Sequence, residues 1–164
     1  MIKEKLLTVI REQVDSATAL QNIAGMADNF SAVVERSVLY PYVRFTASCS
    51  VPTMIGRKAI SVDCLVDGIN GLGATADPFS TGQMALCDEI RLQHRITSDA
   101  AQRTAQRTVT HQLGRQFRMI ALFDVQLEAA GTIYKRFWII KIGNGRIMTD
   151  SVTGNMHTLS ANAA

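Results

Sequence analysis

The stretch that decides the fold runs from residue 119 to residue 150 and reads MIALFDVQLEAAGTIYKRFWIIKIGNGRIMTD. From Met119 to Leu127 the odd positions are all apolar, and the even positions from Asp124 onward are polar. This is the period of a half-buried β-strand. The segment Ala129-Ala130-Gly131 then predicts a turn, because glycine adopts a positive φ without steric cost. We therefore predict two antiparallel strands joined at residues 129–131.

A second turn follows at Asn144-Gly145, a dipeptide that is the strongest short-range signal for a β-hairpin. If Glu128 faces Thr132, one register brings opposite side chains together, and such pairs stabilise a sheet by roughly 0.2–1 kcal/mol each. The predicted pairs are Phe123 with Phe137, Val125 with Lys135, Leu127 with Ile133, Leu122 with Trp138, and Asp124 with Arg136. Both faces of the middle strand are apolar, so we expect a homodimer.

Composition limits the class of protein. The chain has 164 residues, 47% of them hydrophobic and 19% charged, which is typical of one globular domain. We assign residues 1–159 to a single domain and residues 160–164 to a frayed tail. A net charge of +3 does not favour nucleic acid. No apolar run reaches the roughly 20 residues that span a bilayer, and residues 1–14 lack signal-peptide features. We expect a cytoplasmic protein that does not bind membranes.

The cysteines and histidines give no metal motif. Cys49, Cys64 and Cys87 are odd in number and lie among apolar neighbours, which predicts buried free thiols. The histidines lie at positions 94, 111 and 157, without zinc-site spacing to the cysteines. No glycine-rich phosphate loop is present. We therefore expect no metal and no cofactor.

Apolar spacing of three and four residues predicts an amphipathic helix over residues 2–26, with a break near Asp15-Ser16, where a new N-cap is available. Ser31 can cap a further helix from Ala32 to about Leu39. Pro41 then ends helical structure, since the residue before a proline avoids the α region.

Clean alternation predicts a hairpin of strands 42–51 and 58–66. Residues 67–80 are rich in glycine and predict a long loop, and residues 81–92 predict a helix. The sequences Asp67-Gly-Ile-Asn-Gly and Asp150-Ser-Val-Thr-Gly share one pattern after a strand. We interpret this as repeated turn chemistry.

Residues 99–118 allow two interpretations. As a helix, Arg103, Arg107, His111, Arg115 and Arg118 form a basic stripe that suits nucleic acid or simply faces solvent. As a strand from Ala105 to Leu113, the segment uses the β propensity of Thr108-Val109-Thr110. We favour the strand, which places Arg107 and His111 on its more apolar face.

This order of elements resembles the NTF2-like superfamily, in particular its SnoaL-like and scytalone-dehydratase-like branch. The similar segments are Met26-Ala-Asp-Asn-Phe-Ser-Ala-Val, Leu39-Tyr-Pro-Tyr-Val-Arg-Phe, Thr108-Val-Thr-His111, Gly131-Thr-Ile-Tyr134 through Phe137, and Gly145-Arg-Ile-Met. The resemblance implies an α+β cone, in which a strongly curved antiparallel sheet wraps around the N-terminal helices. It also implies an apolar pocket and a dimer. The superfamily includes isomerases, dehydratases and non-catalytic modules, so the fold does not settle the function.

The candidate catalytic residues are His111, Arg107 and Asp28. An inward histidine exchanges protons near neutral pH, and Arg107 can stabilise an enolate-like intermediate. Structural roles remain open for both. For Asp28 the alternative is an N-cap role, since the second acid that the family has a few residues upstream is replaced here by Ala24 and Gly25. Tyr42, Asp63, Phe123 and Tyr134 are candidate ligand-binding residues.

We expect a pocket that binds a small apolar molecule, with cofactor-free isomerase, dehydratase or cyclase chemistry if the protein is an enzyme. The alternative is a non-enzymatic dimeric interaction module. A third class, nucleic-acid binding, requires residues 99–118 to be helical.

Overall fold

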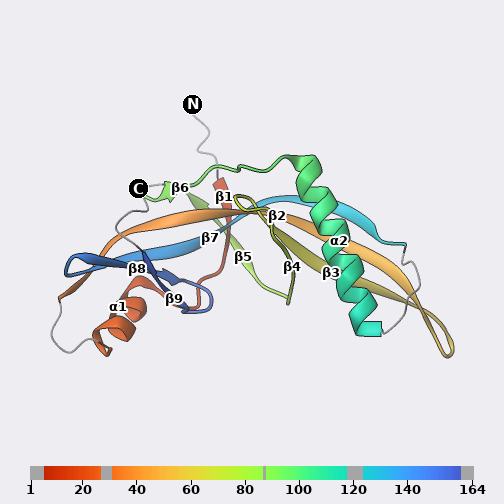
Figure 1. Ribbon diagram of the computed structural model, residues 1–164, viewed down its shortest axis with the longest axis horizontal. Helices are drawn as coiled ribbons and strands as arrows, with labels where there is room; N and C mark the ends of the chain where they lie inside the picture. The colour runs from red at the N-terminus through yellow and green to blue at the C-terminus, as the bar shows by residue number, and fades with distance from the viewer. Residues whose placement is uncertain (1–5, 27–30, 87, 118–123, 160–164) are drawn as a thin grey trace. The chain divides into compact units, whose positions relative to one another are not determined.

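The computed structural model describes residues 6–26, 31–86, 88–117 and 124–159 (Figure 1). The protein is a mixed α+β protein, as the sequence predicted. Its helices are α1 (Ser16–Ala24) and α2 (Ser98–Phe117). Its strands are β1 (Leu6–Ile10), β2 (Ala32–Thr53), β3 (Gly56–Asp67), β4 (Gly73–Ala76), β5 (Thr81–Ala85), β6 (Ile90–Arg91), β7 (Gln126–Ile142), β8 (Gly145–Asp150) and β9 (Met156–Leu159).

The chain divides into two compact units. Unit 1 comprises Met1–Tyr40, Ser80–Leu92 and Tyr134–Ala164, and unit 2 comprises Pro41–Phe79 and Gln93–Ile133. The long strands β2 and β7 contribute residues to both units.

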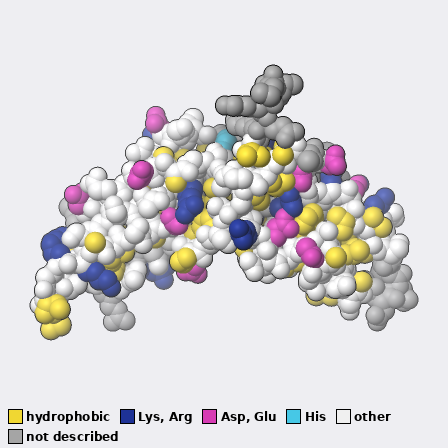
Figure 2. All heavy atoms as spheres, turned by 180° about the vertical axis from the view of Figure 1, so that it is seen from behind, with side chains coloured by type: hydrophobic (Ala, Val, Ile, Leu, Met, Phe, Trp, Pro, Cys, Tyr) yellow, Lys and Arg dark blue, Asp and Glu magenta, His cyan; other side chains and the backbone are white. Residues whose placement is uncertain are grey.

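In unit 2 the predicted hairpin of residues 42–66 is confirmed. Strands β2 and β3 pair antiparallel from Tyr42 opposite Asp67 to Thr53 opposite Gly56. Phe45, Cys49 and Cys64 point into the core, as the alternation predicted. The hairpin ends in a turn at Met54 and Ile55, which are both fully exposed. Figure 2 shows this end as a yellow group, at the lower left, with Lys and Arg side chains beside it.

The preferred strand over residues 99–118 is wrong, because this segment is helix α2. Thr97 caps the helix: its Oγ1 accepts a hydrogen bond of 3.2 Å from the Ala100 N–H. The helix buries one stripe at four-residue spacing, which comprises Ala101, Ala105, Val109 and Leu113. The sheet of unit 2 provides the apolar surface for this stripe, and its burial outweighs the local β propensity.

The predicted loop over residues 67–80 contains a short strand, β4, which pairs antiparallel with β3. A Cβ built on Gly73 would lie 2.4 Å from Thr108 Oγ1 and 3.0 Å from Thr104 Cγ2. Helix α2 therefore approaches β4 so closely that only glycine fits at residue 73.

In unit 1 the predicted helix over residues 2–26 is half wrong. Residues Leu6–Ile10 form β1, which pairs antiparallel with β5 and contacts Tyr134 of β7 in parallel. The helix begins only at Ser16, where Asp15 accepts a hydrogen bond of 2.8 Å from the Thr18 N–H. The N-cap predicted near Asp15-Ser16 is therefore confirmed.

Two other predicted helices are also strands. Residues 32–39 belong to β2, and this strand continues through Pro41. Residues 81–92 contain β5 and β6 instead of a helix. In each case pairing with a distant strand satisfies the backbone: β5 pairs with β1, and β6 pairs with Val38 and Leu39 of β2.

Residues 124–150 fold only in part as predicted. The hairpin at Asn144-Gly145 is confirmed, because β7 and β8 pair from Phe137 opposite Asp150 to Ile142 opposite Gly145. The turn at residues 129–131 is wrong, because β7 runs uninterrupted through Gly131 at a φ of 88°. The pairs of Val125 with Lys135 and Leu127 with Ile133 therefore do not form.

Of the three other predicted pairs, two involve residues outside the described ranges, and the pair of Asp124 with Arg136 does not form. Leu122 and Phe123 lie outside the described residues. Arg136 bonds to Glu12 and Glu89 instead of Asp124. Trp138 donates a hydrogen bond to the Val14 carbonyl.

The apolar faces of β7 are covered within unit 1. Ile140 packs with Ala19 and Ile23 of α1. On the other face Phe137 is buried, and its ring lies edge-on to Tyr40 with centroids 6.0 Å apart. The apolar pattern that suggested a dimer thus has intramolecular partners.

The repeated turn chemistry is confirmed. Oδ1 of Asp67 accepts hydrogen bonds of 2.8 and 3.0 Å from the N–H groups of Ile69 and Asn70. Oδ1 of Asp150 accepts the equivalent bonds, of 2.8 and 3.1 Å, from Val152 and Thr153. Each turn closes at a glycine of positive φ, Gly71 at 77° and Gly154 at 75°.

Cys49 and Cys64 are buried free thiols, as predicted, and Cys87 lies outside the described residues. Among the described helices, none is long and apolar enough to cross a membrane.

Candidate functional site

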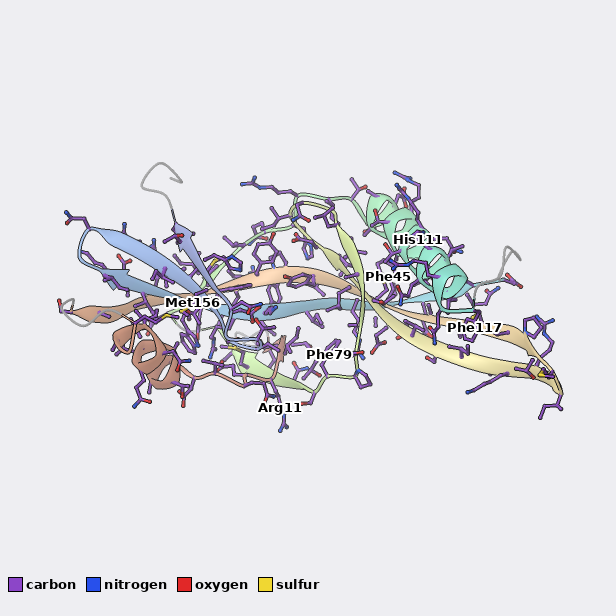
Figure 3. All side chains as sticks on the ribbon, turned by 60° about the horizontal axis from the view of Figure 1, so that its bottom comes forward. Arg11, Phe45, Phe79, His111, Phe117 and Met156 are labelled. Carbon is purple, nitrogen blue, oxygen red and sulfur yellow. The ribbon has the colours of Figure 1, made fainter. Side chains whose placement is uncertain are left out.

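Two of the predicted catalytic residues, Arg107 and His111, lie together in a groove of unit 2 between α2 and β4. This groove, called here the α2–β4 groove, has a volume of about 490 Å³ and is open to solvent. Its lining comprises Gly73, Ala74, Thr75, Arg107, Thr108, His111 and Gln112. Figure 3 shows His111 on α2 and Phe45 in the core beside the helix.

Helix α2 sets the direction of the Arg107 and His111 side chains. Arg107 and His111 are four residues apart and therefore lie on one face of the helix. Both are exposed, so the prediction that His111 points inward is wrong. Within the described part of the chain, neither side chain forms an ion pair or a hydrogen bond.

The other wall of the groove is β4, and sequence analysis missed its contribution. On β4, Gly73 and Ala74 present little side chain, whereas Thr75 adds a hydroxyl group that can donate and accept hydrogen bonds, as does Thr108 on α2. The signal for this wall was the run Gly73-Ala-Thr-Ala76, whose small side chains permit the close approach of a helix. A sequence alone does not say which helix approaches.

A second groove, called here the Asp77 groove, continues along the same strand and helix. It shares Thr75 and Gln112 with the first groove. Its lining adds Ser61, Val62, Asp63, Ala76, Asp77, Pro78 and Gln116. The two grooves therefore follow β4 from Gly73 to Asp77, with α2 alongside.

The predicted ligand residue Asp63 lies in the Asp77 groove but is already paired. Its Oδ2 lies 2.9 Å from Arg44 Nη2, and its Oδ1 accepts a hydrogen bond of 3.3 Å from Thr46 Oγ1. The Arg44 guanidinium also stacks 5.0 Å from the ring centroid of Phe79. Asp77 is exposed and forms no ion pair with any described residue.

The remaining predicted site residues are not brought into either groove. Tyr134 is buried in unit 1 against Leu7, Val9 and Leu39. Tyr42 is half-buried on β2, opposite Asp67 of β3. Asp28 and Phe123 lie outside the described residues.

The α2–β4 groove offers one guanidinium, one imidazole, two hydroxyls and one amide, and no carboxylate. This set of donors suits the binding of a carboxylate or phosphate. The set does not suit a metal ion, and no cluster of metal-ligating side chains occurs in the described ranges.

No protein-family model, curated protein or solved structure matches this chain.

The exposed face of α2 also carries charge beyond the groove. Arg103 and Arg115 are exposed on either side of Arg107 and His111. Asp99, in the first turn, is the acidic residue of the helix. The helical stripe considered in the sequence analysis is thus present from residue 103 to residue 115, whereas Arg118 lies outside the described residues.

Proposed function

We propose that this protein is a non-catalytic binding module that holds an anionic group, a carboxylate or phosphate, in the α2–β4 groove. One observation carries the proposal: Arg107 and His111 stand side by side on one groove wall, exposed and without an acidic partner in the described chain. A guanidinium binds a carboxylate or phosphate through two parallel hydrogen bonds, and that of Arg107 is exposed at the groove and available for such a ligand.

Binding fits this groove better than acid–base catalysis does. A general base must be held in a fixed position, and an active site excludes water around the reacting atoms. His111 is exposed in an open groove, and no described side chain hydrogen-bonds to its imidazole. We therefore assign His111 and Arg107 to recognition.

The small apolar ligand expected from the resemblance fits this groove poorly, because five of its seven lining residues carry a guanidinium, imidazole, hydroxyl or amide group. The NTF2-like cone, its apolar pocket and its dimer stay predictions, and the present proposal does not rest on them.

The test uses succinate and inorganic phosphate as separate probes, with backbone amide shifts recorded by NMR on the full chain. We expect saturable shifts of the backbone amide signals of residues 73–75 and 107–112. The affinity should be millimolar, because only one anionic group is held. Arg107→Gln and His111→Gln should each weaken binding at least about threefold, which corresponds to roughly 0.7 kcal/mol.

Arg115→Gln is the matched control, since it removes the same charge from the same helix outside the groove lining. An equal loss of binding in Arg115→Gln and Arg107→Gln would show unspecific charge attraction and would overturn the proposal. The stronger of the two probes distinguishes a carboxylate site from a phosphate site.

A second function, nucleic-acid binding, is favoured by one specific observation. Arg103, Arg107 and Arg115 lie exposed along a helix that is long enough to enter a major groove. About three phosphate contacts would give a logarithmic salt slope of roughly −3 on duplex DNA. Duplex binding that Arg103→Gln and Arg115→Gln weaken as much as Arg107→Gln would favour this function over the groove.

A further inference from the structure

We propose that the ligand of the α2–β4 groove is an extended segment of a partner protein, which adds to the free edge of β4 as a further strand. This inference rests on the proposed function and names its ligand class. It follows from the position of β4: one edge pairs with β3, and in the described chain no strand pairs with the other edge.

A free strand edge presents unpaired backbone N–H and C=O groups, which bind another strand through main-chain hydrogen bonds. The groove lies along β4, because its lining runs from Gly73 to Thr75 and the Asp77 groove continues it through Ala76. β4 carries small side chains at three of its four positions, and Ala74 and Thr75 line the groove together with Arg107, His111 and Gln112 of α2.

The charges along this track are not uniform. Arg107 and His111 lie at the end of the track near Gly73, and the exposed carboxylate of Asp77 lies at the other end. Asp63, close to that end, is neutralised by Arg44. The track therefore has one cationic end and one anionic end.

This polarity selects an occupant. A nucleic acid carries negative charge along its whole length and would be repelled at Asp77. A peptide can carry an acidic side chain for Arg107 and His111 and a basic side chain for Asp77. From Gly73 to Asp77 the strand advances roughly 13 Å, so the two peptide charges should lie about four residues apart.

The experiment measures fluorescence anisotropy of labelled peptides with the full-length protein. The parent peptide alternates threonine and valine and carries one glutamate and, about four positions along, one lysine. One control peptide keeps the composition but replaces both charges by glutamine. Two further control peptides keep every side chain but are N-methylated on alternate residues, one at the odd positions and the other at the even positions. Each lacks the N–H donors along one of its edges, so one of the two cannot form the hydrogen bonds needed for strand pairing.

The parent peptide should bind, Arg107→Gln and Asp77→Asn should each weaken it at least about threefold, and N-methylation in one register should weaken it at least about tenfold. Arg115→Gln should leave the affinity unchanged. Because these side chains are exposed, the variants are expected to fold, and circular dichroism verifies this.

The outcomes separate the two proposals. If both N-methylated peptides bind as tightly as the parent while Arg107→Gln still weakens succinate binding, strand addition is wrong and the anion-binding function stands. If neither succinate, phosphate nor any peptide responds to Arg107→Gln, both proposals are wrong. If duplex DNA binds more tightly than the peptide and displaces it, the occupant of the groove is not a peptide and this proposal is wrong.

Discussion

Gly73 of β4 lies so close to Thr108 of α2 that a Cβ on residue 73 would stand 2.4 Å from Thr108 Oγ1. This contact sets the distance between the helix and the edge strand in unit 2, and hence the width of the α2–β4 groove. A glycine is needed here for close approach rather than for its backbone angles, since its φ is not among the positive values.

Gly73→Ala should therefore destabilise the protein by roughly 1–3 kcal/mol, because the added methyl forces α2 away from β4. Chemical denaturation measures the loss. Thr108→Ala removes the Oγ1 atom that the new methyl meets, so the double variant should recover part of the loss.

Recovery should stay incomplete, because Thr104 Cγ2 would still lie 3.0 Å from the added carbon. Strict additivity of the two single changes would contradict the close contact. Gly82→Ala is a control in unit 1, since a Cβ at Gly82 meets nothing within 4 Å.

Asp150→Asn should cost roughly 1–3 kcal/mol in the free energy of unfolding. Asparagine keeps an oxygen for the N–H groups of Val152 and Thr153 but leaves Lys135 without its counter-ion. The Lys135 side chain is only 19% exposed, and its Nζ lies 2.5 Å from Asp150 Oδ2. Asp150→Ala should cost more, because it also removes the acceptor of the turn. A double-mutant cycle with Lys135→Met measures the coupling, and a value near zero would contradict the ion pair.

The same carboxylate predicts acid sensitivity. Burial raises the pKa of Asp150, but the Lys135 ammonium and the N–H groups of Val152 and Thr153 outweigh it, so the pKa is lowered from 3.8. A lowered folded-state pKa means that this stabilisation is present above the unfolded value and is lost as the pH falls below about 3.8. Urea denaturation measures the free energy of unfolding between pH 5 and about pH 2.5. As the pH falls, this free energy should decrease with a shallower slope in Asp150→Asn than in the wild type. Equal slopes would argue against a lowered pKa.

Cys64 predicts sensitivity at the alkaline end. Burial raises the pKa of this thiol from 9.0 to about 11. Its stabilising contribution is complete below pH 9 and is lost as the pH rises toward 11, because the unfolded chain ionises first. The loss should reach roughly 2–3 kcal/mol.

Denaturant titrations between pH 8 and about pH 11 measure this loss. Cys64→Ala should have a lower free energy of unfolding than the wild type at pH 8, but this free energy should decrease less as the pH rises. The difference between the two proteins isolates the contribution of Cys64 from that of other groups that titrate in this range. Slow modification of Cys64 by a thiol reagent, at the rate of unfolding, is the independent readout. Rapid modification in the folded protein would contradict its burial.

Met54 and Ile55 should contribute almost nothing to stability. Because both are fully exposed, the double change to serine should alter the free energy of unfolding by less than about 0.5 kcal/mol. Val51→Ala, three residues earlier but buried in the core of unit 2, should cost roughly 1–3 kcal/mol by thermal or chemical denaturation. A loss above about 1 kcal/mol in the serine variant would show that the turn is buried against another surface.

Some of the structure follows from local sequence. The alternation over residues 42–66 and the Asn144-Gly145 dipeptide predict two hairpins correctly, because period-two alternation and turn residues act over a few positions. The paired aspartate turns are equally local, since a carboxylate bonds to the N–H groups two and three residues later.

The common face of Arg107 and His111 is the part of the candidate site that follows from local sequence. Arg107 and His111 were placed on one face although the segment was assigned to the wrong element. Residues separated by four positions share a face in a strand and in a helix alike. The groove itself was not predictable, because Gly73 and Thr108 are 35 positions apart by their residue numbers and meet only through packing.

By itself, therefore, the sequence determined two of the predicted hairpins, the aspartate turns, the α1 cap and the common face of Arg107 and His111. Only the tertiary structure decided that residues 6–10 are a strand, that β7 continues through Gly131, and that residues 98–117 are a helix. Short apolar segments satisfy either periodicity, so the outcome depends on which distant surface buries them. For α2 that surface is the core around Phe45 and Cys64, and the same packing brings β4 beside Arg107.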